Sequence, residues 1–379
     1  MKKTVLTFAL AAIVPLAAAS AAGLKVGVIV GETGPGASLG IPYKSTFSIV
    51  PKTLGGLDVQ YIILDDATDA TLAVKQARKL IEEEKVDLLI GSGNVPTTVA
   101  VAEVTNEDKV PQIALSPTPL KPDTSPWTFS VPQSMNVMSL PVVRHMQSKG
   151  IKTVGFIGFT DAWGDLVLNG FKNVPGNNIK VVDEERYARN DTSVAGQVLK
   201  ILAAKPDAVL VGGSGTPGAL PQMTLRQRGY KGPIYHNPAV INKDFLRVGG
   251  KAVEGAYATT GPVMVADQLD DSNPIKPVAL DFIKKYEAKF GEGKLNAFAA
   301  YSWDAYLIAD QAVREAAKTA KPGTAEFRTA IRNALESGKE VVGVHGVYKM
   351  TPKDHTGVDE RAAVLVQVDN GSWKLINVK

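Results

Sequence analysis

The chain has 379 residues, a formal net charge of +4 and no cysteine. Without cysteine it can form neither disulfides nor thiolate metal sites, and cysteine nucleophiles are excluded. Basic residues number 42 against 38 acidic ones and form no stripe interleaved with aromatic residues, which argues against nucleic-acid binding. A chain of this length is too long for one compact core, so we expect two domains.

The N-terminus has the three parts of a secretory signal peptide. Lys2 and Lys3 give a positive start, residues 5–18 are apolar, and residues 19–23 are small. The apolar run of roughly 14 residues is shorter than the about 20 that a membrane-spanning helix needs. We therefore predict a signal peptide at residues 1–21, cleaved near Ala21 or Ala22, and a periplasmic protein that is not inserted in the membrane.

The remaining chain alternates apolar strand patterns with helical patterns. In the first part, strands are predicted at 24–30, 59–64, 86–91 and 110–115, and helices at 71–85 and 95–107. After residue 132, helices are predicted at 135–149, 164–172, 193–204 and 217–228, and strands at 153–159, 179–183, 207–212 and 233–235. After residue 262 come helices at 277–290, 296–318 and 324–336, then strands at 346–350 and 362–368.

Repeated strand–helix units with continuously apolar strands indicate parallel sheets covered on both faces. The predicted fold class is α/β, with two doubly wound parallel-sheet lobes. Proline-rich and polar stretches suggest that the chain crosses three times between the lobes, making a hinge. Lobe 1 is predicted to comprise residues 22–132 plus 262–342, and lobe 2 residues 133–261 plus 343–379.

Several segments together resemble the type I periplasmic substrate-binding proteins of ABC transporters, in the Leu/Ile/Val-binding branch. These segments are Thr33-Gly34-Pro35, Leu64-Asp65-Asp66-Ala67, Ile90 to Thr98, Ser116-Pro117-Thr118, Phe159 to Gly164, and Pro206 to Gly213. The resemblance covers the whole mature chain. It implies a clamp that closes on a small molecule and delivers it to an inner-membrane ABC permease. We expect a monomer without cofactor.

Two strand-to-helix turns, at 91–98 and 116–120, are the candidate site for a ligand carboxylate. Helix N-termini present unpaired N–H groups and a partial positive charge. The resemblance implies that hydroxyls and amides of these turns hold the carboxylate. Thr118 falls at the family's second hydroxyl position, with Ser116 two residues before it. Val95, at the first hydroxyl position, offers only its amide, and Asn94 and Thr97 are polar neighbours. The alternative is ordinary helix capping.

In the second lobe, the resemblance places Trp163 as an aromatic wall against the ligand; the alternative is a core tryptophan. Ser214 and Leu39 stand where the family has larger side chains, which leaves room for a larger ligand. These three residues are therefore candidate ligand contacts.

The segment 235–239 departs from the family pattern. Amino-acid binders tend to place an acid there for the ligand ammonium, whereas this chain has Pro238, with His236 and Asn237 able to bond a hydroxyl or carbonyl. Burying an unpaired ammonium costs several kcal/mol. We therefore expect an apolar or aromatic carboxylate of the benzoate or phenylpropanoid type. A branched-chain amino acid remains the alternative, should Asp161 or another acid pair with the ammonium.

Signals for catalysis and metal binding are weak. The four histidines share no ligand spacing, so no metal is expected. Asp65-Asp66 and Glu184-Glu185 are adjacent pairs, and adjacent strand residues point to opposite faces. We expect a binding protein rather than an enzyme. A periplasmic hydrolase and a ligand-sensing partner of a membrane receptor remain as alternatives of other classes.

Overall fold

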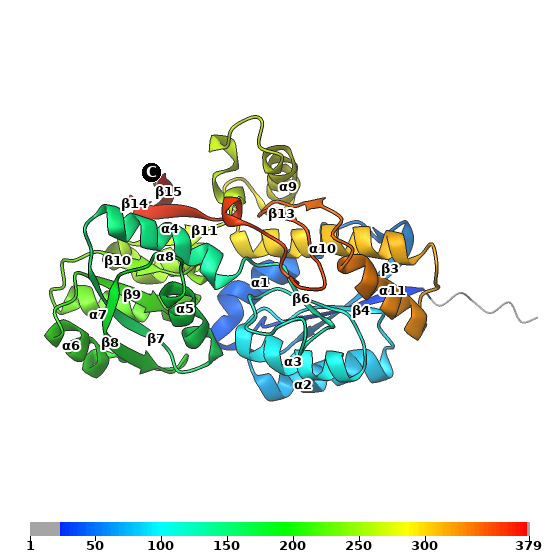
Figure 1. Ribbon diagram of the computed structural model, residues 1–379, viewed down its shortest axis with the longest axis horizontal. Helices are drawn as coiled ribbons and strands as arrows, with labels where there is room; N and C mark the ends of the chain where they lie inside the picture. Colours follow the sequence, from blue (N-terminus) through cyan, green and yellow to red (C-terminus); the bar gives the residue numbers. More distant parts are fainter. Residues whose placement is uncertain (1–22, 377–379) are drawn as a thin grey trace, which may run out of the picture.

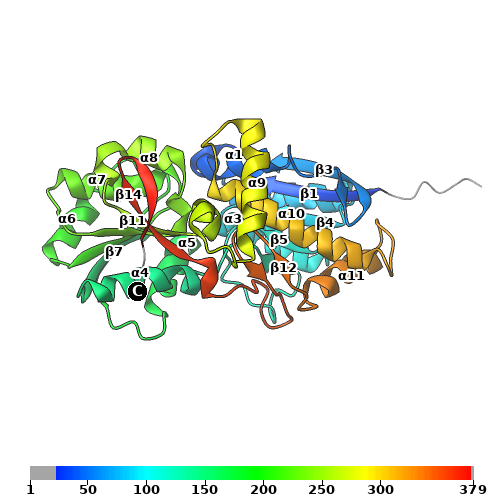
Figure 2. The same ribbon diagram turned by 90° about the horizontal axis from the view of Figure 1, so that it is seen from above.

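The computed structural model describes residues 23–376 of the chain. Two α/β bodies lie side by side along the long axis of the molecule, as both views show (Figures 1 and 2). Each body is built on its own sheet. The expected signal peptide lies outside the described residues. No helix within residues 23–376 has the length and apolar character needed to span a bilayer.

The first body is built on a six-stranded sheet with the order β2-β3-β1-β4-β5-β6. Its strands are β1 (Leu24–Val30), β2 (Thr53–Leu54), β3 (Leu57–Asp65), β4 (Leu88–Gly91), β5 (Gln112–Ala114) and β6 (Thr128–Ser130). All neighbours pair in parallel except β2, which runs antiparallel to β3. The expected strands are therefore present, and the short strands β2 and β6 are additions.

Helices cover both faces of the first sheet (Figure 1). They are α1 (Ala37–Thr46), α2 (Ala70–Arg78), α3 (Val95–Glu107), α10 (Ala297–Ala316) and α11 (Ala325–Leu335). α9 (Ile275–Phe290) packs on the outside of α10, where Phe282 meets Trp303 (Figure 1). Side chains of β1 alternate between the two cores: Ile29 belongs to the core cluster of α2 and α3, and Val28 to that of α1 and α10. Because both faces are buried, the strand is apolar without alternation.

The second body is built on a seven-stranded sheet with the order β15-β14-β11-β10-β9-β7-β8. Its strands are β7 (Thr153–Phe159), β8 (Lys180–Tyr187), β9 (Ala208–Gly212), β10 (Ile234–His236), β11 (Tyr257–Thr260), β14 (Val364–Asp369) and β15 (Ser372–Ile376). Its helices are α4 (Met135–Ser148), α5 (Ala162–Lys172), α6 (Ala195–Ala203), α7 (Ala219–Gln227) and α8 (Lys243–Gly249).

The edge of this second sheet differs from the all-parallel expectation. β14 runs antiparallel to β11 and forms an antiparallel hairpin with β15. The turn between them is Asn370-Gly371, and both residues have positive φ, at 51° and 69°. An Asn-Gly pair in this conformation makes a two-residue hairpin turn whose twist matches that of the flanking strands. An Asn-Gly pair is a hairpin signal in the sequence itself, so β15 could have been predicted.

Three crossings join the bodies within residues 23–376: one between β6 and α4, one after β11, and one before β14. This confirms the predicted α/β fold with two doubly wound lobes and a three-crossing hinge. A separate hairpin, β12 (Val341–Val342) and β13 (Val347–Tyr348), precedes the third crossing. Asp304 of α10 accepts hydrogen bonds from the backbone N–H groups of Val344 and His345, at 2.6 and 3.0 Å. Because these bonds hold the hairpin to α10, we propose to assign it to lobe 1 and to start the third crossing after Tyr348.

Candidate ligand-binding site

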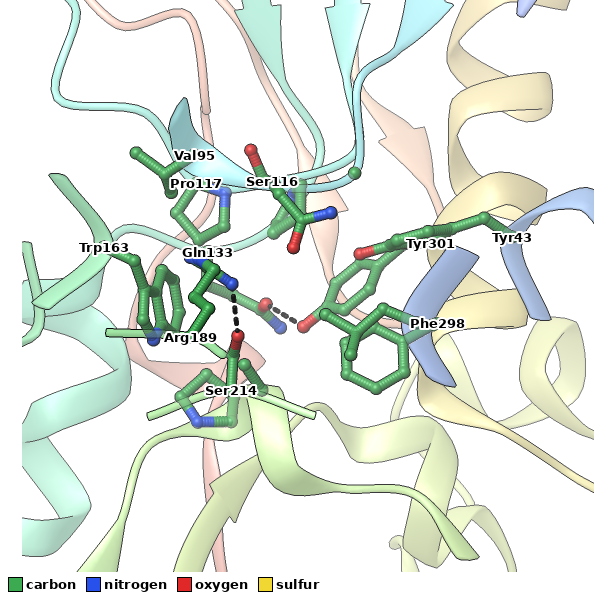
Figure 3. Close-up of a pocket in the computed structure, with 16 residues that line it drawn as sticks. Tyr43, Val95, Ser116, Pro117, Gln133, Trp163, Arg189, Ser214, Phe298 and Tyr301 are labelled. Atoms are coloured by element: carbon green, nitrogen blue, oxygen red, sulfur yellow. Dashed lines mark hydrogen bonds between the residues drawn. The ribbon is translucent and has the colours of Figure 1, made fainter. Parts of the chain in front are cut away.

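A narrow cavity lies between the two bodies, next to the crossings (Figure 3). Its walls come from α1, the turns before α3 and after β5, the first crossing, and α10 on one side. On the other side they come from α5 and the loops after β8, β9 and β10. The lining residues are Leu39, Tyr43, Gly93, Asn94, Val95, Ser116, Pro117, Pro132, Gln133, Trp163, Arg189, Ser214, Pro238, Ala239, Phe298 and Tyr301.

The two bodies touch at the edge of this cavity. The backbone N–H of Thr216 donates to Ser38 Oγ across the gap, at 3.3 Å. Gly215 has a φ of +56°, and a Cβ added there would lie 2.7 Å from Ser38 Oγ. Only glycine is therefore compatible with both the backbone conformation and the close approach. The bodies thus touch beside the cavity, and we refer to this arrangement as the closed form.

The turn at the start of α3 presents unpaired donors. Asn94 is the N-cap residue of α3, but its side chain makes no capping bond. It is 4% exposed, and its Nδ2 is buried without a partner. The backbone N–H groups in the first turn of a helix have no partner within the helix. Asn94 and the N-terminus of α3 can therefore donate hydrogen bonds to an anion in the cavity.

The neighbouring turn is tied to the first by hydroxyl groups. Ser116 Oγ lies 2.7 Å from Thr98 Oγ1, and Thr98 Oγ1 in turn donates to the backbone oxygen of Ser92, at 2.9 Å. Ser130 Oγ donates to the backbone oxygen of Ser116, at 3.1 Å. Ser116 is therefore held rigidly at the cavity wall, where the sequence predicted it.

Two predicted hydroxyls do not line the cavity. Thr97 Oγ1 is buried and is bonded to Ser92 Oγ and the backbone oxygen of Asn94, at 2.7 and 3.0 Å. Thr118 Oγ1 accepts a hydrogen bond from the backbone N–H of Leu120, at 3.1 Å. Both satisfy local backbone or side-chain partners. Neither hydroxyl caps a helix: Thr97 lies inside the first turn of α3, and no helix follows Thr118 before β6, so the prediction of a strand-to-helix turn at 116–120 is wrong.

His236 also lies outside the cavity, contrary to the prediction. It is fully buried and its Nε2 lies 2.6 Å from Gln222 Oε1. Burial lowers the pKa of His236 to about 3, so the ring is neutral. Asn237 donates to the backbone oxygens of Val211 and Gly213 and does not reach the cavity either. From this segment, Pro238 and Ala239 form the wall instead.

Trp163, Ser214 and Leu39 line the cavity, and their contact with a ligand stays a prediction. The indole Nε1 of Trp163 donates to the backbone oxygen of Gly213, at 3.2 Å. This bond fixes the orientation of the ring. Trp163 is 4% exposed, so it is both a core residue and a wall residue. The two interpretations of Trp163 that the sequence left open are compatible with each other.

Arg189 is a site residue that the sequence analysis missed. Its Nε pairs with Asp161 Oδ2 at 2.5 Å, and its Nη1 donates to Ser214 Oγ at 2.9 Å (Figure 3). The guanidinium lies 4.4 Å from the ring centre of Phe159. Among the cavity-lining residues of the described chain, Arg189 is the only charged one. Its position just after a parallel strand, at the sheet edge where ligands bind, was a usable signal.

The aromatic side chains Tyr43, Phe298 and Tyr301 were also missed. They lie on α1 and α10 and complete the apolar wall opposite Trp163 (Figure 3). Tyr43 Oη donates to the backbone oxygen of Leu115, at 2.6 Å. In sequence these residues have the spacing of core-facing helix positions. No sequence signal separates a core aromatic residue from one that lines a cavity.

The site has the groups needed to bind a small anion and no cluster suited to a metal. Within residues 23–376, no three His, Cys, Asp or Glu side chains come together as metal ligands. Asp161, the acid nearest in sequence to the wall, is already paired with Arg189 and also caps α5 by accepting from the backbone N–H of Trp163, at 2.9 Å. The cavity therefore offers donors and an aromatic surface, without a free carboxylate.

Comparisons with known proteins agree with this architecture. The family model described as periplasmic binding protein matches residues 23–372. The Leu/Ile/Val-binding protein homolog 3 of Brucella melitensis is 24% identical, over 89% of this chain and 90% of the relative.

Two solved structures illustrate the similarity in three dimensions. An extracellular ligand-binding receptor from Rhodopseudomonas palustris HaA2 is 44% identical with a TM-score of 0.91, over 94% of this chain and 100% of that one. A solute binding protein of an ABC transporter from R. palustris, in complex with benzoate, is 21% identical with a TM-score of 0.77, over 94% and 96%. The chain belongs to the periplasmic binding protein family, in the branch of the Leu/Ile/Val-binding proteins.

Proposed function

We propose that this protein is the ligand-capturing component of an ABC importer, and that its ligand is a small apolar or aromatic carboxylate. The ligand enters the cleft between the lobes, favours the closed form by contacting both, and is delivered to a membrane permease. A ligand shifts such an equilibrium only through its different affinity for the two forms. Contacts to both lobes at once supply that difference.

The observation that carries the proposal is the charge pattern of the cavity. Among its lining residues within 23–376 there is one cation, Arg189, and no acid. A carboxylate between Arg189 and the N-terminus of α3 gains charge-assisted hydrogen bonds from both lobes. The ammonium of an α-amino acid has no counter-charge in these walls, and its burial costs several kcal/mol.

The apolar part of the ligand is assigned to the aromatic walls. Trp163 lies on one side, and Tyr43, Phe298 and Tyr301 on the other. A flat ring between such walls gains aromatic contacts in addition to buried area. The benzoate complex on the same fold supports this class of ligand in general terms.

A branched-chain amino acid is the second candidate. It is favoured by the name of the Brucella relative, a Leu/Ile/Val-binding protein homolog. Such a ligand would place its carboxylate at the same turns and its side chain against Trp163. Its ammonium would then have to rely on neutral acceptors.

Calorimetry on the purified protein distinguishes the two candidates. The panel comprises benzoate, 4-hydroxycinnamate, benzamide, leucine and valine. We expect the aromatic acids to bind, the amide to bind at least tenfold more weakly, and the amino acids not to bind measurably. Tight binding of leucine or valine, with no binding of the aromatic acids, would refute the aromatic-acid proposal.

A pair of matched variants tests the turn after β5. Ser116→Ala is expected to weaken binding of the aromatic acid by about 1 kcal/mol. Thr98 Oγ1 donates to Ser92, so Ser116 donates to Thr98 and must turn its hydroxyl proton from Thr98 to the carboxylate when the ligand binds. Thr118→Ala, two residues away, is expected to leave the affinity unchanged, because the Thr118 hydroxyl accepts a hydrogen bond from the backbone N–H of Leu120 and does not line the cavity. Titration calorimetry of both variants measures the difference. Equal losses in the two would remove Ser116 from its assigned role.

A further inference from the structure

Gln133 lies where the ligand cavity meets the first crossing between the lobes. It follows β6 and precedes α4, and its side chain is 1% exposed. Its Oε1 accepts a hydrogen bond from Tyr301 Oη at 2.8 Å (Figure 3). Its Nε2 donates to the backbone oxygen of Ala362 at 2.6 Å. Ala362 stands just before β14, on the third crossing. One buried amide therefore links α10, the first crossing and the third.

The second crossing contacts Tyr301 indirectly, through the ring of His345. The ring of His345 stacks on Tyr301, with centroids 3.8 Å apart and planes 19° from parallel. Its Nε2 lies 3.0 Å from the backbone oxygen of Ala297. Gly261, which follows β11, packs against the other edge of the ring, where a Cβ would lie 1.9 Å from Nδ1. Any side chain at Gly261 would therefore displace the histidine.

These contacts form a buried hub of Gln133, Tyr301, His345 and Gly261. It touches all three crossings of the described chain, and two of its members, Gln133 and Tyr301, also line the cavity. Opening of the clamp must change the backbone dihedrals of the crossings relative to one another. The two bonds of Gln133 join α10 to the third crossing, so a motion that shifts this crossing relative to α10 would strain them. A buried amide that loses a hydrogen-bond partner stays desolvated with no bond to compensate, and this destabilises the protein.

We propose that Gln133 is a positioning residue that couples the cavity to the hinge, and that its bond from Tyr301 stabilises the closed form. The ligand then acts on the hinge directly, through a wall residue, as well as by bridging the lobes. The inference goes beyond the proposed ligand class. It relies on that proposal only for the ligand-dependent part of its test.

The variant Tyr301→Phe removes the hydroxyl and keeps the ring, its stacking on His345 and its place in the wall. Because the chain has no cysteine, Lys75→Cys on α2 and Leu199→Cys on α6 give a clean pair of labelling sites on opposite lobes. Both sites are exposed. Single-molecule fluorescence transfer between the labels then measures the open and closed populations without any ligand.

We expect Tyr301→Phe to raise the ratio of open to closed molecules roughly fivefold in the ligand-free protein, the effect of losing one buried hydrogen bond. Tyr187→Phe is the matched control. It also removes a buried hydroxyl that donates to a carbonyl oxygen, but its bond to Pro217 lies within lobe 2 and Tyr187 does not line the cavity. The control should keep the parental populations.

Two outcomes would overturn the coupling: unchanged populations in Tyr301→Phe, or equal shifts in Tyr301→Phe and Tyr187→Phe. Titration with benzoate gives the second readout. Affinity should fall in proportion to the lost closed population. If the ligand-free shift occurs but no aromatic acid binds either protein, the coupling stands and the proposed ligand class fails.

Discussion

Arg189→Gln is expected to weaken binding of the aromatic carboxylate by about 2–4 kcal/mol, or roughly 30- to 1,000-fold in Kd. The guanidinium is the only charged group in the cavity wall of the described residues, and its side chain is 13% exposed. Glutamine keeps a donor of similar length but loses the charge and the forked geometry. Calorimetry with 4-hydroxycinnamate, and with its amide as a neutral analogue, measures the loss.

The controls for this prediction distinguish direct contact between Arg189 and the ligand from a structural role of Arg189. Asp161→Asn removes the charge partner of Arg189 but leaves the guanidinium in place. It should retain or strengthen carboxylate binding, because less of the positive charge is neutralised. Arg189→Gln should cost the neutral amide far less than the acid. If the acid and the amide lost affinity equally, Arg189 would be a structural residue and not the anion anchor.

Trp163→Ala is expected to cost about 2 kcal/mol, roughly thirtyfold in Kd, for ligands that carry an aromatic ring. The indole is held by its bond to Gly213, so the ring meets the ligand already oriented. A straight-chain aliphatic acid should lose less, because it gains no aromatic contact. Competition measurements with a benzoate-type acid and hexanoate test this difference in selectivity.

A loss of stability must be distinguished from a loss of ligand contact, because Trp163 also belongs to the core. Large-to-small substitutions of a buried tryptophan cost about 3–5 kcal/mol of folding free energy. Trp127→Ala is the matched control, since Trp127 is 8% exposed and does not line the cavity. It should destabilise the protein without changing the affinity. Equal selectivity in Trp163→Ala and the parent would contradict the assignment of Trp163 as a wall.

Much of the fold follows from local pattern. The strand Leu24–Val30 is mostly apolar because helices cover both faces of its sheet. Several strands of this kind indicate a doubly wound sheet. Edge strands are harder to predict. The Asn-Gly turn makes β14 and β15 an antiparallel hairpin. β14 also pairs antiparallel with β11, which lies more than a hundred residues earlier in the chain. Pairing at that distance depends on tertiary packing.

The candidate site divides in the same way. Ser116, Asn94 and Trp163 were predicted because the ends of parallel strands and the starts of helices meet at one edge of a sheet. Thr118 and His236 were assigned to the site by the same reasoning. The structure gives their polar atoms other partners, Leu120 and Gln222. The direction of a polar side chain depends on which neighbouring group forms a hydrogen bond with it.

By itself, the sequence determined the class of fold, the absence of disulfides and the helix N-terminus at Val95 that can hold an anion, because composition and periodicity are local properties. Only the tertiary structure decided which side chains meet. It brought Arg189 of lobe 2 opposite the N-terminus of α3, and joined Gln133 to Tyr301 across 168 residues of chain. These contacts depend on how two separate sheets face each other, and no local pattern encodes that orientation.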